Sequence, residues 1–488
     1  MDKNFFAQCE REQLHLSGAV QAHGTLLMVD SHGRISHAAS NVADFLGAPP
    51  AHWVGQPLPA ELAPLVADLA SGPGSRKNWV GAVDRGAGLL DVVVSRGEAR
   101  KVAIELTPHQ ADSTGGIAPD RIRPSPPLRS DEALAAAREA LTERIAGLTG
   151  FQRVMYYAFR EDGDGEVIAE TRRDEAYGSY LGLRFPASDI PEIARRLYLK
   201  NPWRLIPDAQ AEPVALKGRD AHTPDLTWSD LRSVSLVHRV YLANMGVRAS
   251  LSFPVVIDGA LAALIAAHHR EVRQVPLAVL EHAEALVRAH ALAVSAYQSA
   301  QYSRLVSRLS RRFEDIQALI RPHGRLISSW PQFASWLMGE FLADGATLCI
   351  DETSLGAGHS FEPAALSASD AWFRKKHGDL VWASDNLSHQ VPDYPQSEIA
   401  GALALQVVSG DGSSLRLYLT RTEYIHKVAW GGNPEKPVEI HNGILNIAPR
   451  RSFEKWVEKR RGYSRSWDNQ ACLLALSLAE LLHREFHS

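Results

Sequence analysis

The chain has 488 residues, of which 45% are hydrophobic and 22% charged, and 52 basic against 56 acidic side chains give a net charge of −4. This length predicts about three domains. The charge balance excludes the strongly basic surface of a nucleic-acid-binding or anionic-membrane-binding protein. No apolar run approaches the roughly 20 residues of a membrane span, and the first residues are polar rather than signal-like.

The three cysteines are Cys9, Cys349 and Cys472. Their spacing matches neither a disulfide framework nor a zinc site, which favours a reducing cytoplasm and predicts no metal. Cys9 precedes any convincing strand. It is either a tolerated small residue or a thiol that a mobile arm delivers into a site elsewhere.

The first domain is expected to be a PAS-type α+β sensor. Strands are predicted at 25–30 and 34–40 around a tight turn, and a short helix from Asn41 ends at Gly47. Further strands follow at 89–94 and 101–106. The stretch 113–129 is rich in glycine and proline, which predicts a linker.

The second domain has strands on both sides of a long helical and loop insertion, as in a GAF domain, and this insertion is expected to form the wall of a ligand pocket. Its predicted helices are 131–148 and 231–245, and its predicted strands are 151–159, 165–170, 247–257 and 260–268, the last two joined by Asp258-Gly259.

A long helix is predicted from Pro276 to about Ile320, as a spine between domains and one candidate dimer surface. The third α+β region follows, with strands at 348–351, 402–408 and 415–420. The last helix, 468–486, lacks a cap, so we expect it to continue beyond Ser488.

The segment Phe185 to Pro191 is typical of a helix entry. Ser188 or Asp189 is a candidate N-cap, Pro191 suits the first turn, and Asp189 with Glu192 has capping-box spacing. Taken alone, this pattern predicts a helix cap and no further role.

Several polar residues nevertheless lie in segments that otherwise read as buried, and each alone has an ordinary structural explanation. Together they provide an acid, two imidazoles, hydroxyl groups and two guanidinium groups, which suit a large planar ligand carrying ring N–H groups and carboxylates. They are Tyr157, Asp189, Tyr198, Arg204, Arg232, His238, Tyr241, Ser250, Ser252 and His268. No nucleotide-binding, serine-hydrolase or zinc-protease motif accompanies them.

Over nearly its whole length the sequence resembles the bacteriophytochromes. In the second domain the resemblance rests on four blocks, 185–191, 231–238, 241–250 and 264–269. In the third region it rests on Trp430-Gly431-Gly432, Pro449-Arg450-Arg451-Ser452-Phe453 and Trp456-Val457-Glu458, which match the hairpin "tongue" of a PHY domain. It implies an α+β fold of three sensor domains (PAS, GAF and PHY), each an antiparallel sheet with flanking helices. A helical spine would join them, and the tongue would reach the GAF pocket.

The same resemblance implies domain boundaries. These are an arm at 1–20, PAS at 21–115, a linker at 116–130, GAF at 131–275, the spine at 276–320 and PHY at 321–488, with the tongue at about 421–466.

It also implies a covalently bound linear tetrapyrrole. Plant and many cyanobacterial relatives attach theirs through a cysteine immediately before the histidine that corresponds to His238. Here that position is Val237, and residues 130–302 contain no cysteine. Cys9 therefore corresponds to the bacteriophytochrome cysteine, which implies a thioether to the A-ring vinyl group of biliverdin IXα.

The roles implied for individual residues follow the family. The Asp189 carbonyl and His238 face the pyrrole N–H groups, and Arg204 and Arg232 bind the propionates with Ser250 and Ser252. Tyr157, Phe185 and Tyr241 surround the D-ring, His268 bonds its carbonyl, and Tyr198 lies near Asp189, with Ile190 and Pro191 completing the contacts. The Asp189 carboxylate pairs with Arg450 of the tongue, and Trp430, Ser452 and Phe453 take part in the same light-driven switch.

The sequence departs from the family at Ala22 and Leu236, where proline is common, and at 417–423, which is less aromatic than usual. None of these changes removes a proposed pocket contact.

The expected function is a red/far-red photoreceptor, acting as a cytoplasmic homodimer on a histidine kinase or response regulator, with cyclase or transcriptional outputs left open. The alternatives are a chemical sensor of the same architecture and, more remotely, an acid–base enzyme using Asp189 and His238. These 488 residues contain no catalytic motif, although the full-length protein of such a receptor can carry a kinase.

Overall fold

The chain is described by a computed structural model that covers residues 13–84, 88–110, 127–160, 162–175, 178–219, 222–320, 327–351, 353–375, 380–408, 414–432, 434, 438–441, 444–447, 453 and 455–486. It divides into two compact units, Met1–Ser295 with Ala429–Trp456, and Ala296–Val428 with Val457–Ser488. Most of the expected linker at 113–129 lies outside the described residues. No described helix is long and apolar enough to cross a membrane.

The first sheet of unit one has seven strands in the order β1-β11-β3-β2-β6-β5-β4. Its PAS-region strands are β1 (Ala19–Val20), β2 (Thr25–Val29), β3 (Ile35–Ala39), β4 (Arg76–Asp84), β5 (Leu89–Arg96) and β6 (Val102–Pro108). Short helices α2 (Val42–Leu46), α3 (Pro50–Trp53) and α4 (Ala63–Ala67) accompany them. Gly47 ends α2 with φ +76°, as predicted for a C-cap.

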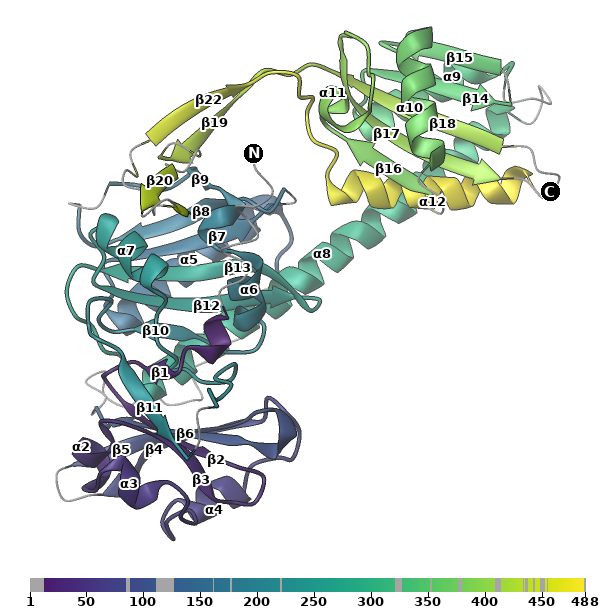
Figure 1. Cartoon of the computed structure of the whole chain (residues 1–488). Coiled ribbons are helices and arrows are strands. Elements are labelled where there is room, and N and C mark those ends of the chain that lie inside the picture. Colours follow the sequence, from purple (N-terminus) through teal and green to yellow (C-terminus); the bar gives the residue numbers. More distant parts are fainter. Residues whose placement is uncertain are drawn as a thin grey trace. The chain divides into compact units, whose positions relative to one another are not determined.

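One strand of this sheet comes from the middle of the chain. β11 (Val214–Gly218) pairs with β1 through Ala19↔Ala215 and with β3 through Leu216↔Ala39, and Figure 1 shows it entering the PAS sheet. The sequence pattern predicts no strand here, where the stretch forms part of the helical and loop insertion of the second domain. Its partners are almost 200 residues away in sequence, so no local pattern reveals the pairing.

The second sheet has the order β10-β12-β13-β7-β8-β9-β19-β22. Its strands are β7 (Arg153–Phe159), β8 (Gly165–Arg172), β9 (Arg184–Phe185), β10 (Arg204–Ile206), β12 (Ala249–Ile257), β13 (Ala260–His269), β19 (His426–Gly431) and β22 (Lys455–Arg460). The expected β12–β13 hairpin forms around Asp258-Gly259, with φ of +50° and +81° at these residues.

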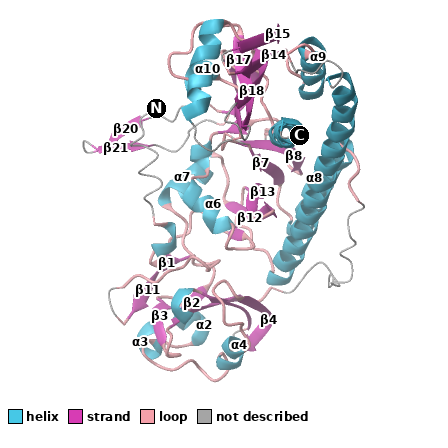
Figure 2. Cartoon of the chain, turned by 90° about the vertical axis from the view of Figure 1, so that its right-hand side faces the viewer, coloured by secondary structure: helices cyan, strands magenta, loops and turns pink. Residues whose placement is uncertain are grey.

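Helices cover both faces of this sheet. On the back face, α5 (Asp131–Thr149) and the start of α8 (Leu277–Ile320) pack against alternate residues of β7, β12 and β13. On the front face lie α6 (Glu192–Tyr198) and α7 (Leu236–Asn244), as Figure 1 shows. α8 is one uninterrupted helix of 44 residues, which confirms the long helix predicted over 276–320 (Figure 2).

Two predicted helix starts are wrong. α7 begins at Leu236 and not at Leu231, because the preceding backbone is bonded elsewhere: the Asp230 and Leu231 N–H groups donate to the Glu105 carboxylate and the Ser233 N–H donates to the Ala19 carbonyl. Ser235 then provides the N-cap, and its Oγ accepts from the His238 N–H at 3.2 Å.

The second correction concerns Asp189, which does not cap α6. Residues Ala187–Asp189 form a short 3₁₀ turn, Pro191 is the N-cap residue, and no side chain caps the helix. The Asp189 carboxylate instead accepts a hydrogen bond from Tyr241.

Unit two contains a five-stranded sheet in the order β15-β14-β18-β17-β16. Its strands are β14 (Gly345–Ile350), β15 (Thr353–Gly358), β16 (Val381–Ser384), β17 (Ile399–Val408) and β18 (Ser414–Thr422). Its helices, in addition to the end of α8, are α9 (Trp330–Phe341), α10 (Pro363–Lys375), α11 (Leu387–Gln390) and α12 (Asn469–Phe486). α9 and α12 bury apolar side chains against one face of this sheet. A separate hairpin, β20 (Val438–His441) with β21 (Ile444–Ile447), lies within Ala429–Trp456.

Candidate functional site

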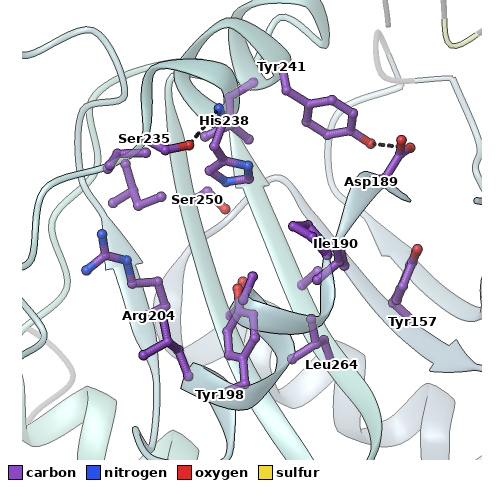
Figure 3. Close-up of a pocket in the computed structure, with 18 of the residues that line it drawn as sticks. Tyr157, Asp189, Ile190, Tyr198, Arg204, Ser235, His238, Tyr241, Ser250 and Leu264 are labelled. Carbon is purple, nitrogen blue, oxygen red and sulfur yellow. Dashed lines mark hydrogen bonds between the residues drawn. The ribbon is translucent and has the colours of Figure 1, made fainter. Parts of the chain in front are cut away.

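A cavity of about 540 Å³ opens on the front face of the second sheet, between the strands and helices α6 and α7 (Figure 3). This volume lies in the range of small-molecule sites. The described residues expected to contact a ligand all line it; they are Tyr157, Phe185, Asp189, Ile190, Pro191, Tyr198, Arg204, Arg232, His238, Tyr241, Ser250, Ser252 and His268. Cys9, Arg450 and Ser452 lie outside the described residues.

Several lining residues were not predicted from the sequence, among them Met155, Leu264 and Ala266. Their positions carry a signal, because side chains two residues apart on a strand share a face. Met155 alternates with Tyr157 on β7, and Leu264 and Ala266 alternate with His268 on β13. Val167, Tyr180 and Trp203 also line the cavity and were missed.

Two imidazoles face the cavity from opposite walls. His238 points inward from α7 (Figure 3), and burial followed by the charge of Arg204 lowers its pKa to about 4. His268 lies on β13, where burial, then the charges of Arg153 and His238, lower its pKa to about 3. Both rings are therefore neutral near pH 7. Among the described residues, the buried Nδ1 atom of His268 has no hydrogen-bond partner, which leaves it available to a ligand.

Two guanidinium groups also line the cavity. Arg204 Nη1 donates to the Asp230 carbonyl at 2.7 Å, and its Nη2 donates to the Arg232 carbonyl at 2.5 Å. Arg232 Nη1 donates to the Leu226 carbonyl at 3.3 Å. Burial lowers the pKa of Arg232 to about 9, so it is still a cation at neutral pH. Main-chain carbonyls thus hold both cations in place at a largely buried site, an arrangement that favours an anionic ligand group.

Tyr241 connects α7 with Asp189. Its hydroxyl donates to Asp189 Oδ2 at 3.1 Å (Figure 3). The Tyr241 ring lies parallel to His238 with centroids 6.1 Å apart, and edge-on to Phe453 at 5.2 Å. Phe453 belongs to the segment Ala429–Trp456 of unit one, so this segment contacts a residue of the cavity wall.

The same segment also contacts the wall at Phe185. Trp430 of β19 is buried and pairs in parallel with Arg184 of β9. A Cβ atom on Gly431 would lie 2.5 Å from the Phe185 ring, so only glycine allows this close approach. Trp430 and Phe453 therefore lie beside Phe185 and Tyr241, whereas the partners expected at 450 and 452 are not described.

Gly165 of β8 gives Tyr157 the space it occupies. A Cβ atom on this glycine would lie 1.8 Å from the Tyr157 ring, so any side chain there would displace the tyrosine. The orientation of Tyr157, which lines the cavity, thus depends on Gly165, which does not line it.

The cavity as a whole combines an apolar lining with two neutral imidazoles, two buried cations and several hydroxyl groups. This set fits a large flat ligand that has anionic groups at one end and N–H or carbonyl groups along its body. None of the described lining residues is a cysteine. Covalent attachment would need a thiol from elsewhere in the chain.

Comparisons with known proteins agree with this architecture. The PAS fold matches residues 9–75, the GAF domain 134–297 and the phytochrome region 301–488. A bacteriophytochrome from Xanthomonas campestris is 31% identical over 97% of this chain and 78% of its own length. A bacteriophytochrome from Pseudomonas aeruginosa is 30% identical over 97% of this chain, which spans 65% of that relative's length.

Among solved structures, the photosensory core module of the Stigmatella aurantiaca phytochrome has a TM-score of 0.81 at 29% identity, covering 98% of each chain. The matched domains lie in the order PAS, GAF, PHY, as in that module. Sequence and structure together show that the chain belongs to the phytochrome family and has the architecture of a phytochrome photosensory core.

Proposed function

We propose that this chain is a red/far-red light receptor that binds a bilin, and specifically biliverdin IXα, in the front-face cavity. The observation that carries the proposal is that two guanidinium groups, those of Arg204 and Arg232, line the same cavity as the buried Nδ1 of His268, which has no hydrogen-bond partner among the described residues. A bilin has propionates for the first and a ring carbonyl for the second. When bound, it supplies absorption of red light and rotation of its D-ring.

The chain's own residues hold and orient this group. Arg204 and Arg232 bind the propionates, with the Ser250 and Ser252 hydroxyls beside them on β12. His238 and the Asp189 carbonyl face the pyrrole nitrogens, and His268 bonds the D-ring carbonyl. Tyr198, Ile190 and Pro191 close the cavity, and Tyr157, Phe185 and Tyr241 enclose the D-ring and exclude water.

Cys9 supplies the covalent bond in this proposal. Cys9 would hold the bilin through a thioether, in which its sulfur would add to one carbon of the A-ring vinyl group and a proton to the other, so no oxidant or leaving group would be required. Cys349 is an unsuitable alternative, because burial raises its pKa to about 11 and the thiolate is the reactive form.

The switch in this proposal is the carboxylate of Asp189, which exchanges partners between Tyr241 and Arg450. Trp430, Ser452 and Phe453 follow when the tongue, at about 421–466, refolds. The pairing of Trp430 with Arg184, the residue before Phe185, and the ring contact of Phe453 with Tyr241 support this assignment. The remaining boundaries proposed are an arm at 1–20, PAS at 21–115, GAF at 131–275, the spine at 276–320 and PHY from 321.

We further propose a cytoplasmic homodimer formed along α8, which signals to a kinase or response-regulator output. A chemical sensor of the same fold would use this cavity for a ligand that does not respond to light. An acid–base role for Asp189 and His238 receives no support, since the low pKa of His238 makes it a weak base at neutral pH.

The test is to co-express the chain with a haem oxygenase and record absorption spectra before and after red light. We expect a red-absorbing species that light converts to a far-red-absorbing one. A pigmented protein unaffected by light would support the sensor alternative, and no pigment would overturn the proposal.

Attachment is tested separately by intact mass. Cys9→Ser should abolish the covalent adduct, whereas Cys472→Ser, the matched control, should retain it. An adduct that survives Cys9→Ser would overturn the attachment site alone.

A further inference from the structure

A buried acid of the PAS sheet contacts the segment that leads into α7. Glu105 lies on β6 and is only 2% exposed. Its carboxylate accepts hydrogen bonds from Ser229 Oγ, from the Asp230 N–H at 3.2 Å and from the Leu231 N–H at 2.8 Å. Three donors from three consecutive residues therefore converge on one side chain.

The carbonyl groups of the same segment hold Arg204. The Asp230 and Arg232 carbonyls accept from the two terminal nitrogens of its guanidinium group. The N–H groups of residues 230 and 231 thus bond Glu105, while carbonyls at 230 and 232 bond a cation of the cavity. Displacing this segment would move Arg204 with it.

An ion pair supports the arrangement from β4. Arg76 bonds both carboxylate oxygens of Asp230, with Nη1 to Oδ1 at 2.9 Å. Its guanidinium carbon lies 4.5 Å from the centroid of the Trp203 ring. Trp203 immediately precedes Arg204. The PAS sheet therefore contacts the surroundings of Arg204 at two places, through Glu105 of β6 and through Arg76 of β4.

We propose that Glu105 is a positioning residue for the cavity: its ionised carboxylate fixes residues 229–231, and through them Arg204, so that protonation of Glu105 loosens the anion-binding end of the site. Glu105 does not itself line the cavity, so it would act on the site through residues 229–231. The part of the inference that concerns bilin rests on the function proposed above. The anchoring of residues 229–231 by Glu105 is independent of that proposed function.

The charged groups around Glu105 place its titration near neutral pH. Burial, followed by the negative charge of Asp230, raises the pKa of Glu105 to about 7, against the opposing hydrogen bonds from Ser229 and Leu231 and the charge of Arg76. Arg204 and Arg232 face the same cluster, and Glu281 of α8 lies close enough to act on Arg76.

The nearby histidines titrate in a different range. The pKa values of His23 and His238 are lowered to about 4, and that of His268 to about 3. We assign a transition near pH 7 to Glu105, and the variant Glu105→Gln tests this assignment. Above it, the carboxylate accepts all three hydrogen bonds, and below it the neutral carboxyl is a weaker acceptor.

The first test uses the bilin-free chain and measures amide hydrogen exchange in peptides covering 229–235 at pH 6 and pH 8, corrected for the intrinsic chemical rate. We expect protection to be about tenfold lower at pH 6, since one to two hydrogen bonds weaken. Glu105→Gln should remove the difference between the two pH values. An unchanged difference in this variant would overturn the proposal.

The matched control is Asp91→Asn on the neighbouring strand β5. Asp91 is equally buried and accepts from the Gly81 N–H and from His109, both at 2.7 Å, but it does not touch residues 229–231. This variant should keep the wild-type pH difference. Loss of the difference in Asp91→Asn would show a general effect on the PAS sheet and would contradict the specific role of Glu105.

The second test titrates the red absorption band of the biliverdin-loaded chain from pH 5.5 to 9. We expect a step with a midpoint near 7 that is absent in Glu105→Gln. Ser229→Ala removes one donor to the ionised carboxylate, so the midpoint should move to higher pH. This variant also decides the matter if Glu105→Gln fails to fold, because an unshifted midpoint would overturn the proposal. A chain that binds no biliverdin would contradict the proposed function, while hydrogen exchange would still decide the anchoring.

Discussion

The two faces of the second sheet are built from the same strands, but one face packs into the core and the other lines the cavity. Back-face residues of β12 and β13, such as Leu251, Phe253 and Ile265, pack against α5 and α8 in a continuous core. Front-face residues one position away, such as Ser250, Leu264 and His268, surround a cavity. Alternate residues of each strand point to opposite faces of the sheet. We therefore expect a substitution to affect the stability of the core or the binding of a ligand, according to the face on which the residue lies.

Each face also buries a histidine. Within the described part of the chain, His268 on the front has no partner for its Nδ1 and His290 of α8 on the back has none for its Nε2, which lies beside the Tyr156 ring, at 5.5 Å between centroids. The front imidazole opens on space for a ligand, whereas the back one is enclosed by core side chains. Under the proposed function, the same residue type serves ligand recognition on one face and packing on the other.

The largest effect we predict comes from truncating matched leucines on the two faces. Leu251→Ala on the back should lower the free energy of unfolding by about 4 kcal/mol, because it leaves a sealed void. Leu264→Ala on the front should cost about 2 kcal/mol, because its missing atoms only enlarge an existing cavity. Urea unfolding of the bilin-free variants measures both. Equal losses would contradict the distinction between the faces.

A glycine substitution tests the front face from within its wall. Gly165→Ala places a methyl group in the Tyr157 ring, and we expect a loss of about 1–3 kcal/mol from overpacking. The displaced ring should also broaden the absorption band of bound biliverdin. Gly178→Ala is the control, because a Cβ atom there meets nothing within 4 Å. An unaltered spectrum and stability in Gly165→Ala would show that Tyr157 is not held in this way.

The smallest predicted effect concerns pH and the two buried histidines. Both have pKa values lowered by burial, to about 3 for His268 and about 4 for His290. The unfolded chain therefore binds more protons below pH 6.5, and stability falls as pH decreases. Between pH 6.5 and 5.5 each histidine should contribute about 1 kcal/mol to this loss.

His290→Leu isolates the back-face contribution in unfolding measurements at the two pH values. This variant should show a shallower decrease in stability than the wild type. Saturation with biliverdin should stabilise the chain through His268 without altering the contribution of His290. An identical pH dependence in His290→Leu would contradict the assignment.

Local sequence patterns were sufficient to predict the elements whose structure depends on residues close together in the chain. The β12–β13 hairpin follows from alternating apolar residues around Asp258-Gly259, and α8 follows from apolar residues at helical spacing. The candidate ligand residues could be found because polar groups in otherwise apolar segments are unusual. Their convergence on one cavity could be expected only from the family resemblance.

Long-range contacts explain what could not be predicted. The pattern of Asp189 and Glu192 is that of a capping box, yet the carboxylate bonds Tyr241, which lies 52 positions away. The residues from Leu231 have helical character, but the Leu231 N–H donates to the Glu105 carboxylate and the Ser233 N–H donates to the Ala19 carbonyl, so the helix starts only at Leu236. In both places a distant partner overrides a local preference.

The central claim is that the front-face cavity binds the bilin, and filling that cavity tests it most directly. Ala266 lines the cavity on β13, and Ala266→Trp would place an indole ring where the ligand is proposed to lie. The measurement is the red absorption band formed when biliverdin is added to this variant and to the wild type, both shown to be folded by their unfolding transitions. The account predicts a red band in the wild type and none in Ala266→Trp. An unchanged band in the variant would contradict it.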